Sequence, residues 1–192
     1  MDEKLADRLR RSPVIASVKS EDDLEYALAS PCRVICLLFG EISTIGALTR
    51  RVTDAGKDAF VNLDMVDGLA PRASAVRFIR DQTSATGILT SKVPVCRAAS
   101  DSGLVAILRF FMVDSFAYGQ VVSQSASAKA HAVEILPGCI PRVITWMRDD
   151  LSLPIIAGGL VCNITDIMDA LDAGAAAIAT SSKELWSVAP SA

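Results

Sequence analysis

Eight short apolar runs punctuate the chain, and their spacing constrains the fold more than any other feature. Each run is followed by a segment with helical spacing or helix-capping residues, which is the pattern of alternating strands and helices. Runs that are apolar on both faces are typical of parallel strands covered by helices. The predicted strands are residues 13–18, 33–40, 59–66, 86–91, 104–113, 132–136, 154–158 and 176–181.

Eight strand-helix units in a chain of 192 residues predict one closed (β/α)8 TIM-type barrel with short loops. We assign residues 1–192 to this single α/β domain, with a core from about residue 13 to residue 186 and termini that fray outside it. A flavodoxin-like or Rossmann sheet is the alternative fold. No GxGxxG motif follows the first apolar run, which argues against a dinucleotide-binding sheet.

Helix-capping residues stand where the barrel needs helices to begin and end. Ser20, Asp114 and Asn163 precede helical segments, and Gly174 is placed to end the last full helix. The final segment, residues 183–189, leaves room for only an abbreviated eighth helix.

Composition excludes several classes of protein. No apolar run is long enough to span a membrane and the N-terminus lacks an apolar signal core, so we expect a cytoplasmic protein without membrane contact. The five cysteines lack CxxC spacing and are interpreted as buried free thiols. With His131 as the one histidine, we expect no metal site, no cofactor and no Ser-His-Asp triad.

The last two strand ends carry a pattern suited to a phosphate. Gly158 and Gly159 follow the seventh run, and Thr180 and Ser181 end the eighth. In TIM barrels a phosphate commonly binds between these two loops, where backbone amides face it. The alternative is structural, with the glycines making a tight turn and the hydroxyl residues capping a short helix.

Four charged residues are predicted to lie near the same mouth of the barrel, namely Lys19, Asp64, Arg109 and Glu134. Strand alternation places Asn62 and Asp64 on one face of the third strand. Buried charges must be paired, so these residues form either a closed ion-pair network or a socket for a polar ligand. Paired acids beside a lysine also suit proton transfer, so a sugar-phosphate isomerase or epimerase is a second functional hypothesis.

The segments "EILPGCIPRVITWM", "NLDMVDGL", "LRFFMVDS", "PIIAGGLV" and "DALDAGAAAIATSSKELW" together resemble the glycerol uptake operon antiterminator regulatory family. The resemblance runs from about residue 13 to residue 186. It implies a barrel that senses glycerol 3-phosphate and acts on the leader mRNA of glycerol-utilisation genes as a transcription antiterminator rather than an enzyme.

Carried over by position, the resemblance assigns phosphate binding to Gly158, Gly159, Thr180 and Ser181. It places Lys19, Asp64, Arg109 and Glu134 around the rest of the ligand, and no catalytic residue is expected. Lys19 stands where the family is expected to carry arginine.

RNA binding depends on the resemblance alone at this stage. The formal net charge is −3, the pI is near 5.2, and the arginines are scattered in small groups without a known RNA-binding motif. Three hypotheses therefore stay open: a ligand-responsive RNA regulator, a sugar-phosphate enzyme, and a barrel used only for protein interactions. A homo-oligomer is compatible with each of them, and the sequence does not decide the oligomeric state.

Overall fold

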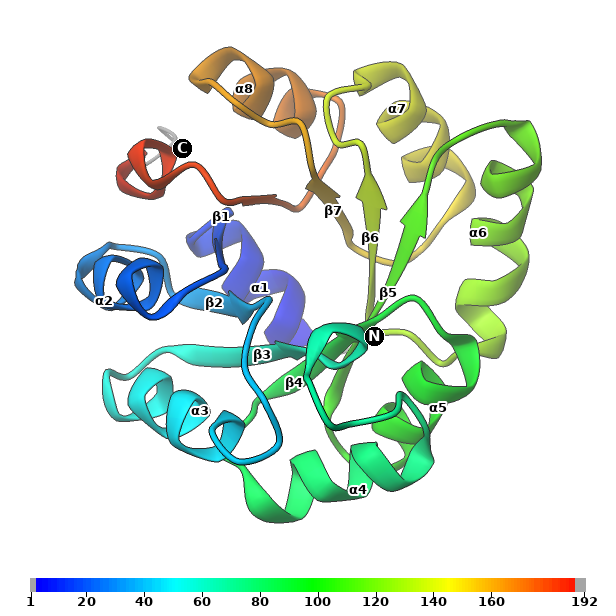
Figure 1. Cartoon of the computed structure of the whole chain (residues 1–192). Coiled ribbons are helices and arrows are strands. Elements are labelled where there is room, and N and C mark those ends of the chain that lie inside the picture. Colours follow the sequence, from blue (N-terminus) through cyan, green and yellow to red (C-terminus); the bar gives the residue numbers. More distant parts are fainter. Residues whose placement is uncertain (1–2, 189–192) are drawn as a thin grey trace.

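The computed structural model describes residues 3–188, which form a closed barrel of parallel strands with helices around it (Figure 1). The strands are β1 (Val14–Val18), β2 (Val34–Leu37), β3 (Asp58–Asn62), β4 (Gly87–Thr90), β5 (Val105–Phe111), β6 (Ala132–Leu136), β7 (Ile155–Gly158) and β8 (Ala177–Thr180). The helices are α1 (Glu3–Arg11), α2 (Glu21–Ala29), α3 (Ile45–Asp54), α4 (Ala73–Gln82), α5 (Val93–Asp101), α6 (Ser115–Ser127), α7 (Pro141–Asp150) and α8 (Ile164–Asp172). Two 3-10 helices complete the elements, η1 (Leu63–Met65) and η2 (Lys183–Ser187).

The barrel wall follows chain order from β1 to β8 and closes by pairing β8 with β1. This closure confirms the (β/α)8 fold and excludes the open flavodoxin-like or Rossmann sheet. Alternate residues of each strand point to opposite sides of the wall. On β1, for example, Val14 and Ala16 pack in the layer between strands and outer helices, whereas Ile15 packs inside the barrel.

The predicted caps are present in the structure. The side chains of Ser20, Asp114 and Asn163 each accept a hydrogen bond from the first turn of the following helix. Asn163 also forms a reciprocal capping box with Asp166. Gly174, just after α8, adopts a φ of 110°, a conformation that glycine accommodates most readily.

The two ends of the chain differ from each other. The prediction of a frayed N-terminus is wrong from Glu3 onward, because α1 inserts Leu5 and Leu9 into the apolar cluster inside the barrel. In Figure 1, α1 lies across the barrel while α2 to α8 surround it. The predicted short eighth helix is confirmed as η2; the expectation of fraying at residues 189–192 lies outside the described residues.

Several strands end earlier than the apolar runs predicted. The run 59–66 was expected to be one strand, but β3 ends at Asn62 and η1 follows. The Asn62 side chain accepts a hydrogen bond from the backbone N–H of Asp64, at 3.2 Å, which turns the chain out of the strand. Asp64 therefore lies in a 3-10 turn, not on the strand face shared with Asn62. None of the described helices is both long enough and apolar enough to cross a membrane.

Candidate functional site

A polar layer lies at the carboxyl ends of the strands, directly above the apolar filling of the barrel. Inside the barrel Ile15, Ile107, Ala132 and Ile156 pack together with inward residues of the other strands. Two residues further along each strand point to the same side of the wall. This step brings Ser17, Asn62, Ser91, Arg109, Glu134, Gly158 and Ser181 to the mouth, together with one apolar residue, Leu38.

An ion pair between β5 and β6 forms the centre of this layer. Arg109 and Glu134 are direct neighbours in the strand register, and Arg109 Nε donates to Glu134 Oε2 at 2.5 Å. The Glu134 side chain is 5% exposed and that of Arg109 is 13% exposed. No fully buried side-chain nitrogen or oxygen among the described residues lacks a partner, so the two terminal nitrogens of Arg109, which make no described hydrogen bond, are not fully buried.

The pair is electrostatically costly, as a buried pair should be. Burial raises the pKa of Glu134, and the Arg109 guanidinium opposes that rise. Burial lowers the pKa of Arg109, but attraction and hydrogen bonding to Glu134 outweigh this effect and the net shift is upward. Beneath the pair, burial and then the Glu134 charge raise the pKa of the Cys36 thiol to about 12. Cys36 is therefore a neutral thiol at physiological pH.

Asp64 also reaches the mouth, but neighbouring residues already occupy its carboxylate. Its Oδ1 accepts from Thr90 Oγ1 at 2.7 Å, and its Oδ2 accepts from the backbone N–H and the hydroxyl of Ser91 at 2.6 and 2.7 Å. These three bonds fix the loop after β4 against η1. Asp64 thus has an evident role in holding the mouth together.

Two glycines allow a close approach of side chains to the backbone beside the ion pair. A Cβ on Gly158 would lie 2.8 Å from Glu134 Oε1, closer than real contacts allow. Gly159 has a φ of 71°, and a Cβ there would lie 3.2 Å from a methyl group of Leu136. The absence of side chains at these positions lets Glu134 and Leu136 pack directly against the backbone at the end of β7.

The β8 end is held against both neighbouring strands. Thr180 Oγ1 donates to the carbonyl of Val161, at 2.9 Å, and accepts from the N–H of Ser182, at 3.1 Å, so its hydroxyl ties the loops after β7 and β8 together. Lys19 Nζ donates to Ser181 Oγ at 3.0 Å, across 162 positions of sequence. The exposed Lys19 therefore brings a positive charge beside the candidate phosphate loop.

One further cation stands at this end of the barrel and was not singled out from the sequence. Lys183, the first residue of η2, bonds Asp23 at 2.6 Å. The hydrogen bond from Lys183 is the main cause that lowers the pKa of Asp23. The "TSSK" sequence carried the signal, since a lysine in the first turn after the hydroxyl residues must lie near them.

The predicted site residues fall into three adjoining groups at one mouth. Arg109, Glu134 and Gly158 form the first, Lys19 and Ser181 the second, and Asp64 with the end of β4 the third. Ala179 packs inside the barrel, so the next residue of β8, Thr180, points to the outer side of the wall and supports the loops from there. Among residues 3–188, no group of three or more His, Cys, Asp or Glu side chains is arranged to hold a metal ion.

The expectation for the cysteines needs correction. Cys32, Cys36 and Cys96 are buried free thiols as predicted, but Cys139 and Cys162 are exposed. Both exposed residues lie in loops at the carboxyl ends of β6 and β7, beyond the apolar strands whose hydrophobicity suggested burial.

A (β/α)8 barrel with a polar, glycine-bordered mouth at the carboxyl ends of its strands belongs to the class of TIM barrels that present ligand sites on this face. The solved structure of deoxyribose phosphate aldolase from Aeropyrum pernix shares the fold, with a TM-score of 0.68 over 96% of this chain and 95% of that chain, at 16% identity. This likeness concerns the fold alone.

The chain belongs to the glycerol-3-phosphate responsive antiterminator family, whose model matches residues 14–186. A glycerol uptake operon antiterminator regulatory protein from Listeria monocytogenes is 29% identical, with a TM-score of 0.87 over 90% of this chain and 94% of that one. A glycerol uptake operon antiterminator-related protein from Thermotoga maritima is 31% identical, with a TM-score of 0.82 over 92% of this chain and 99% of that chain. The uncharacterized protein YgcP of Escherichia coli K12 is 37% identical over 94% of this chain and 95% of its own length. The family relatives with described roles are regulators rather than enzymes.

Proposed function

We propose that this protein binds glycerol 3-phosphate at the barrel mouth and, when loaded, acts on the leader mRNA of glycerol-utilisation genes to prevent termination. The observation that carries the proposal is the meeting of Lys19, Ser181, Gly158 and the Arg109–Glu134 pair at one mouth, in a chain of the responsive antiterminator family. Glycerol 3-phosphate has one phosphate group and two free hydroxyl groups. Its site therefore needs both an anion-binding part and hydrogen-bond partners for hydroxyls, and this mouth offers both.

The phosphate is assigned to the loops after β7 and β8. Backbone amides around Gly158, Gly159 and Ser181 can donate to phosphate oxygens, and Thr180 keeps the two loops at a fixed separation. Lys19 balances the negative charge from the end of β1. A charge-assisted hydrogen bond contributes about 1.5–3 kcal/mol, so three or four such bonds are enough for a specific small ligand.

The glycerol part is assigned to the centre of the mouth. The terminal nitrogens of Arg109, which make no described hydrogen bond, can donate to a ligand hydroxyl, and Glu134 can accept from one while it keeps its bond to Arg109. Asp64 borders the same space and holds the β4 loop in place. Because Glu134 is already paired with a guanidinium, it is better suited to accept a hydrogen bond than to remove a proton from a ligand.

The regulatory step is a shift between two populations. Glycerol 3-phosphate joins loops that belong to different strands, so it favours the arrangement in which those loops are ordered. The family description supports a response to glycerol 3-phosphate and an effect on termination. We assign the binding of the leader mRNA to the ligand-ordered form.

The test is calorimetric titration of glycerol 3-phosphate into the protein and into Gly158→Ala. The added methyl group would meet the Glu134 carboxylate, which must shift together with its bond to Arg109 and so disturb the centre of the mouth. Binding should be lost or weakened at least tenfold. Gly119→Ala is the matched control, because nothing lies within 4 Å of the added Cβ in α6; it should bind as the unmodified protein does.

Two outcomes would contradict the proposal. The first is unchanged affinity in Gly158→Ala, and the second is the absence of saturable binding to the unmodified protein. Incubation of the protein with phosphorylated sugars in deuterated water tests the alternative hypothesis that it is an enzyme. Exchange of deuterium into any of them at a catalytic rate would favour the isomerase or epimerase hypothesis instead.

A further inference from the structure

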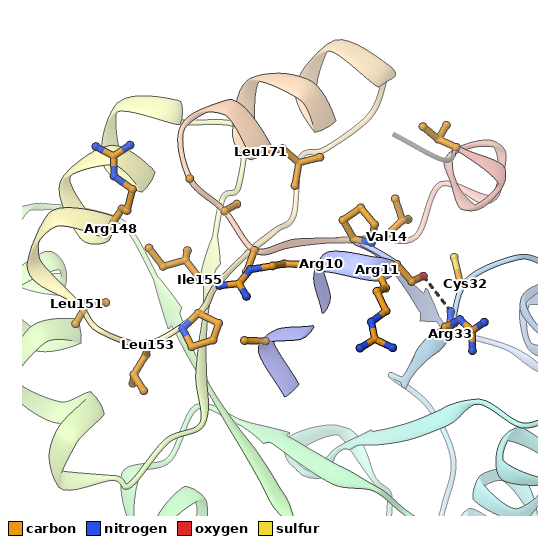
Figure 2. Close-up of a pocket in the computed structure, with 18 of the residues that line it drawn as sticks. Arg10, Arg11, Val14, Cys32, Arg33, Arg148, Leu151, Leu153, Ile155 and Leu171 are labelled. Atoms are coloured by element: carbon orange, nitrogen blue, oxygen red, sulfur yellow. Dashed lines mark hydrogen bonds between the residues drawn. The ribbon is translucent and has the colours of Figure 1, made fainter. Parts of the chain in front are cut away.

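An arginine-lined cleft of about 860 Å³ lies at the end of the barrel opposite the mouth (Figure 2). Its walls come from the end of α1, the amino-terminal ends of β1 and β7, the segment before β2, and η2. The eighth outer helix is only the short η2, so Trp186 and Val188 border a space that a longer helix would fill in a regular barrel. The volume is in the range of binding pockets.

The charge of this cleft is entirely positive among its described lining residues. Arg10 and Arg11 come from α1, Arg33 precedes β2, and Arg148 comes from α7, whereas no Asp or Glu lines the cleft. The chain as a whole has 22 acidic and 19 Lys or Arg residues, so this concentration does not follow from composition. Figure 2 shows Arg10 and Arg11 across the middle of the cleft, with Arg33 at one side and Arg148 at the other.

These arginines are weakly neutralised. Arg11 and Arg33 form no ion pair with any side chain that the structure describes. Arg10 contacts Asp7 at 3.4 Å and Arg148 contacts Asp149 at 2.9 Å, and all four of these side chains are more than 40% exposed. Exposed pairs of this kind contribute little and exchange readily for a better partner.

Other arginines on the surface are engaged differently. Arg51 is held by both Glu21 and Glu25, and Arg8 bonds Asp58 at 3.0 Å. Arg50, Arg72 and Arg77 also form no ion pair with a described side chain, but they do not line this cleft, whereas four arginines surround it. Guanidinium forks match the geometry of phosphate oxygens, and several forks around one cleft suit a ligand with several phosphates.

We propose that this cleft binds the phosphate backbone of the leader RNA, an inference that rests on the proposed function and names its RNA-contacting surface. The apolar side chains between the arginines, including Leu153 and Leu171, offer surface to ribose and bases. The ligand and the RNA then occupy opposite ends of the barrel. β1 joins them directly, since it begins beside Arg11 and ends beside Lys19.

The experiment compares Arg11→Glu/Arg33→Glu with Arg50→Glu/Arg77→Glu in the full chain. The control pair changes the net charge equally, at exposed arginines of α3 and α4 that have no described ion pair. The probes are a glycerol-kinase leader transcript for RNA affinity, measured at several salt concentrations, and glycerol 3-phosphate for integrity of the mouth.

The cleft variant should lose at least a hundredfold in RNA affinity while it binds glycerol 3-phosphate normally. The control variant should change by no more than a few-fold. The logarithmic salt dependence should become shallower by roughly 0.7 for each RNA phosphate that the variant no longer neutralises, if the bound RNA is single-stranded. Arg11→Lys/Arg33→Lys should have an affinity between those of the unmodified protein and the cleft variant, because it retains the charge but loses the guanidinium forks.

Equal losses in the cleft and control variants, or no loss in the cleft variant, would overturn the inference while leaving RNA regulation intact. Failure of the unmodified protein to bind any RNA, with and without glycerol 3-phosphate, would overturn both the inference and the RNA step of the proposed function. If the cleft substitutions instead dissociate a dimer in sedimentation and leave RNA affinity unchanged, the inference is overturned and the cleft is an interface between copies of the chain.

Discussion

Removing Arg109 from the mouth should destabilise the protein in a way that depends on pH. In Arg109→Met the side chain keeps its bulk, but Glu134, which is 5% exposed, loses its guanidinium partner. Breaking a buried pair by deleting one member costs about 3–5 kcal/mol, because the remaining charge is buried without compensation. Urea unfolding monitored through the fluorescence of Trp146 and Trp186 measures this loss.

The pH dependence follows from the direction of the pKa shift. Burial already raises the pKa of Glu134, and loss of Arg109 raises it further because the opposing charge is gone. A carboxyl group whose pKa is higher in the folded than in the unfolded protein contributes stability below its unfolded pKa, near 4.3, and loses it as the pH rises through the folded value. The penalty in Arg109→Met should therefore be largest at pH 7.5 and should shrink toward pH 5.

Glu134→Gln is the matched control, since it has no carboxyl group to titrate and its free energy of unfolding should lack this pH-dependent contribution. The double variant should lose less than the sum of the two single variants, with a coupling of roughly 1–3 kcal/mol. A penalty in Arg109→Met that is independent of pH, together with additive single losses, would refute the buried ion pair as the organising contact of the mouth.

Three further predictions concern the barrel ends and the thiols. Leu9→Ala should lower the free energy of unfolding by about 2–5 kcal/mol, because it empties space between α1 and the barrel interior; urea unfolding would reveal whether α1 is dispensable. A thiol reagent at pH 8 should modify Cys139 and Cys162 in the folded protein but leave Cys36 unmodified until the protein unfolds. Mass spectrometry measures the modification of each cysteine, and rapid modification of Cys36 in the folded protein would contradict its burial and raised pKa. Trp186→Phe should cost roughly 2–3 kcal/mol and weaken glycerol 3-phosphate binding, since its Nε1 donates at 2.8 Å to the carbonyl at the end of β8; unchanged calorimetric affinity would disconnect η2 from the mouth.

The sequence predicted the fold because each βα unit carries its own signal. Apolar runs mark strands and polar caps such as Ser20 mark helix starts, and both depend on neighbouring residues only. The position of Asp64 was misjudged for the opposite reason. Hydrophobic periodicity does not indicate where a strand ends. Here β3 ends because the backbone N–H of Asp64 donates a hydrogen bond to the side chain of Asn62.

The site could be predicted only in part. Neighbouring strands of a barrel end at the same mouth, so Gly158 and Ser181 were expected to lie near each other, and this part of the site could be predicted from the sequence. The bond from Lys19 to Ser181 also follows from closure of β1 on β8. The cleft could not be predicted from the sequence. Arg11, Arg33 and Arg148 lie far apart along the chain, and no local sequence pattern indicates that they meet at the amino-terminal end of the barrel.

The helix α1 shows how a local signal can be overlooked. Leu5 and Leu9 are four residues apart, which places them on one helical face, yet the segment before residue 13 was assigned to a terminus that frays outside the core. Leu5 and Leu9 are buried inside the barrel, and this burial stabilises α1, because a short helix rich in charged residues is marginal without packing.

The central claim is that ligand binding at the mouth controls RNA binding. The most direct measurement is the affinity of the protein for a glycerol-kinase leader transcript at fixed salt, as glycerol 3-phosphate is titrated. We predict a saturable increase in RNA affinity, of about 5- to 150-fold for a typical coupling between two sites, that Gly158→Ala abolishes and Gly119→Ala preserves. RNA affinity that stays constant across the titration, while calorimetry confirms that the ligand is bound, would contradict the account.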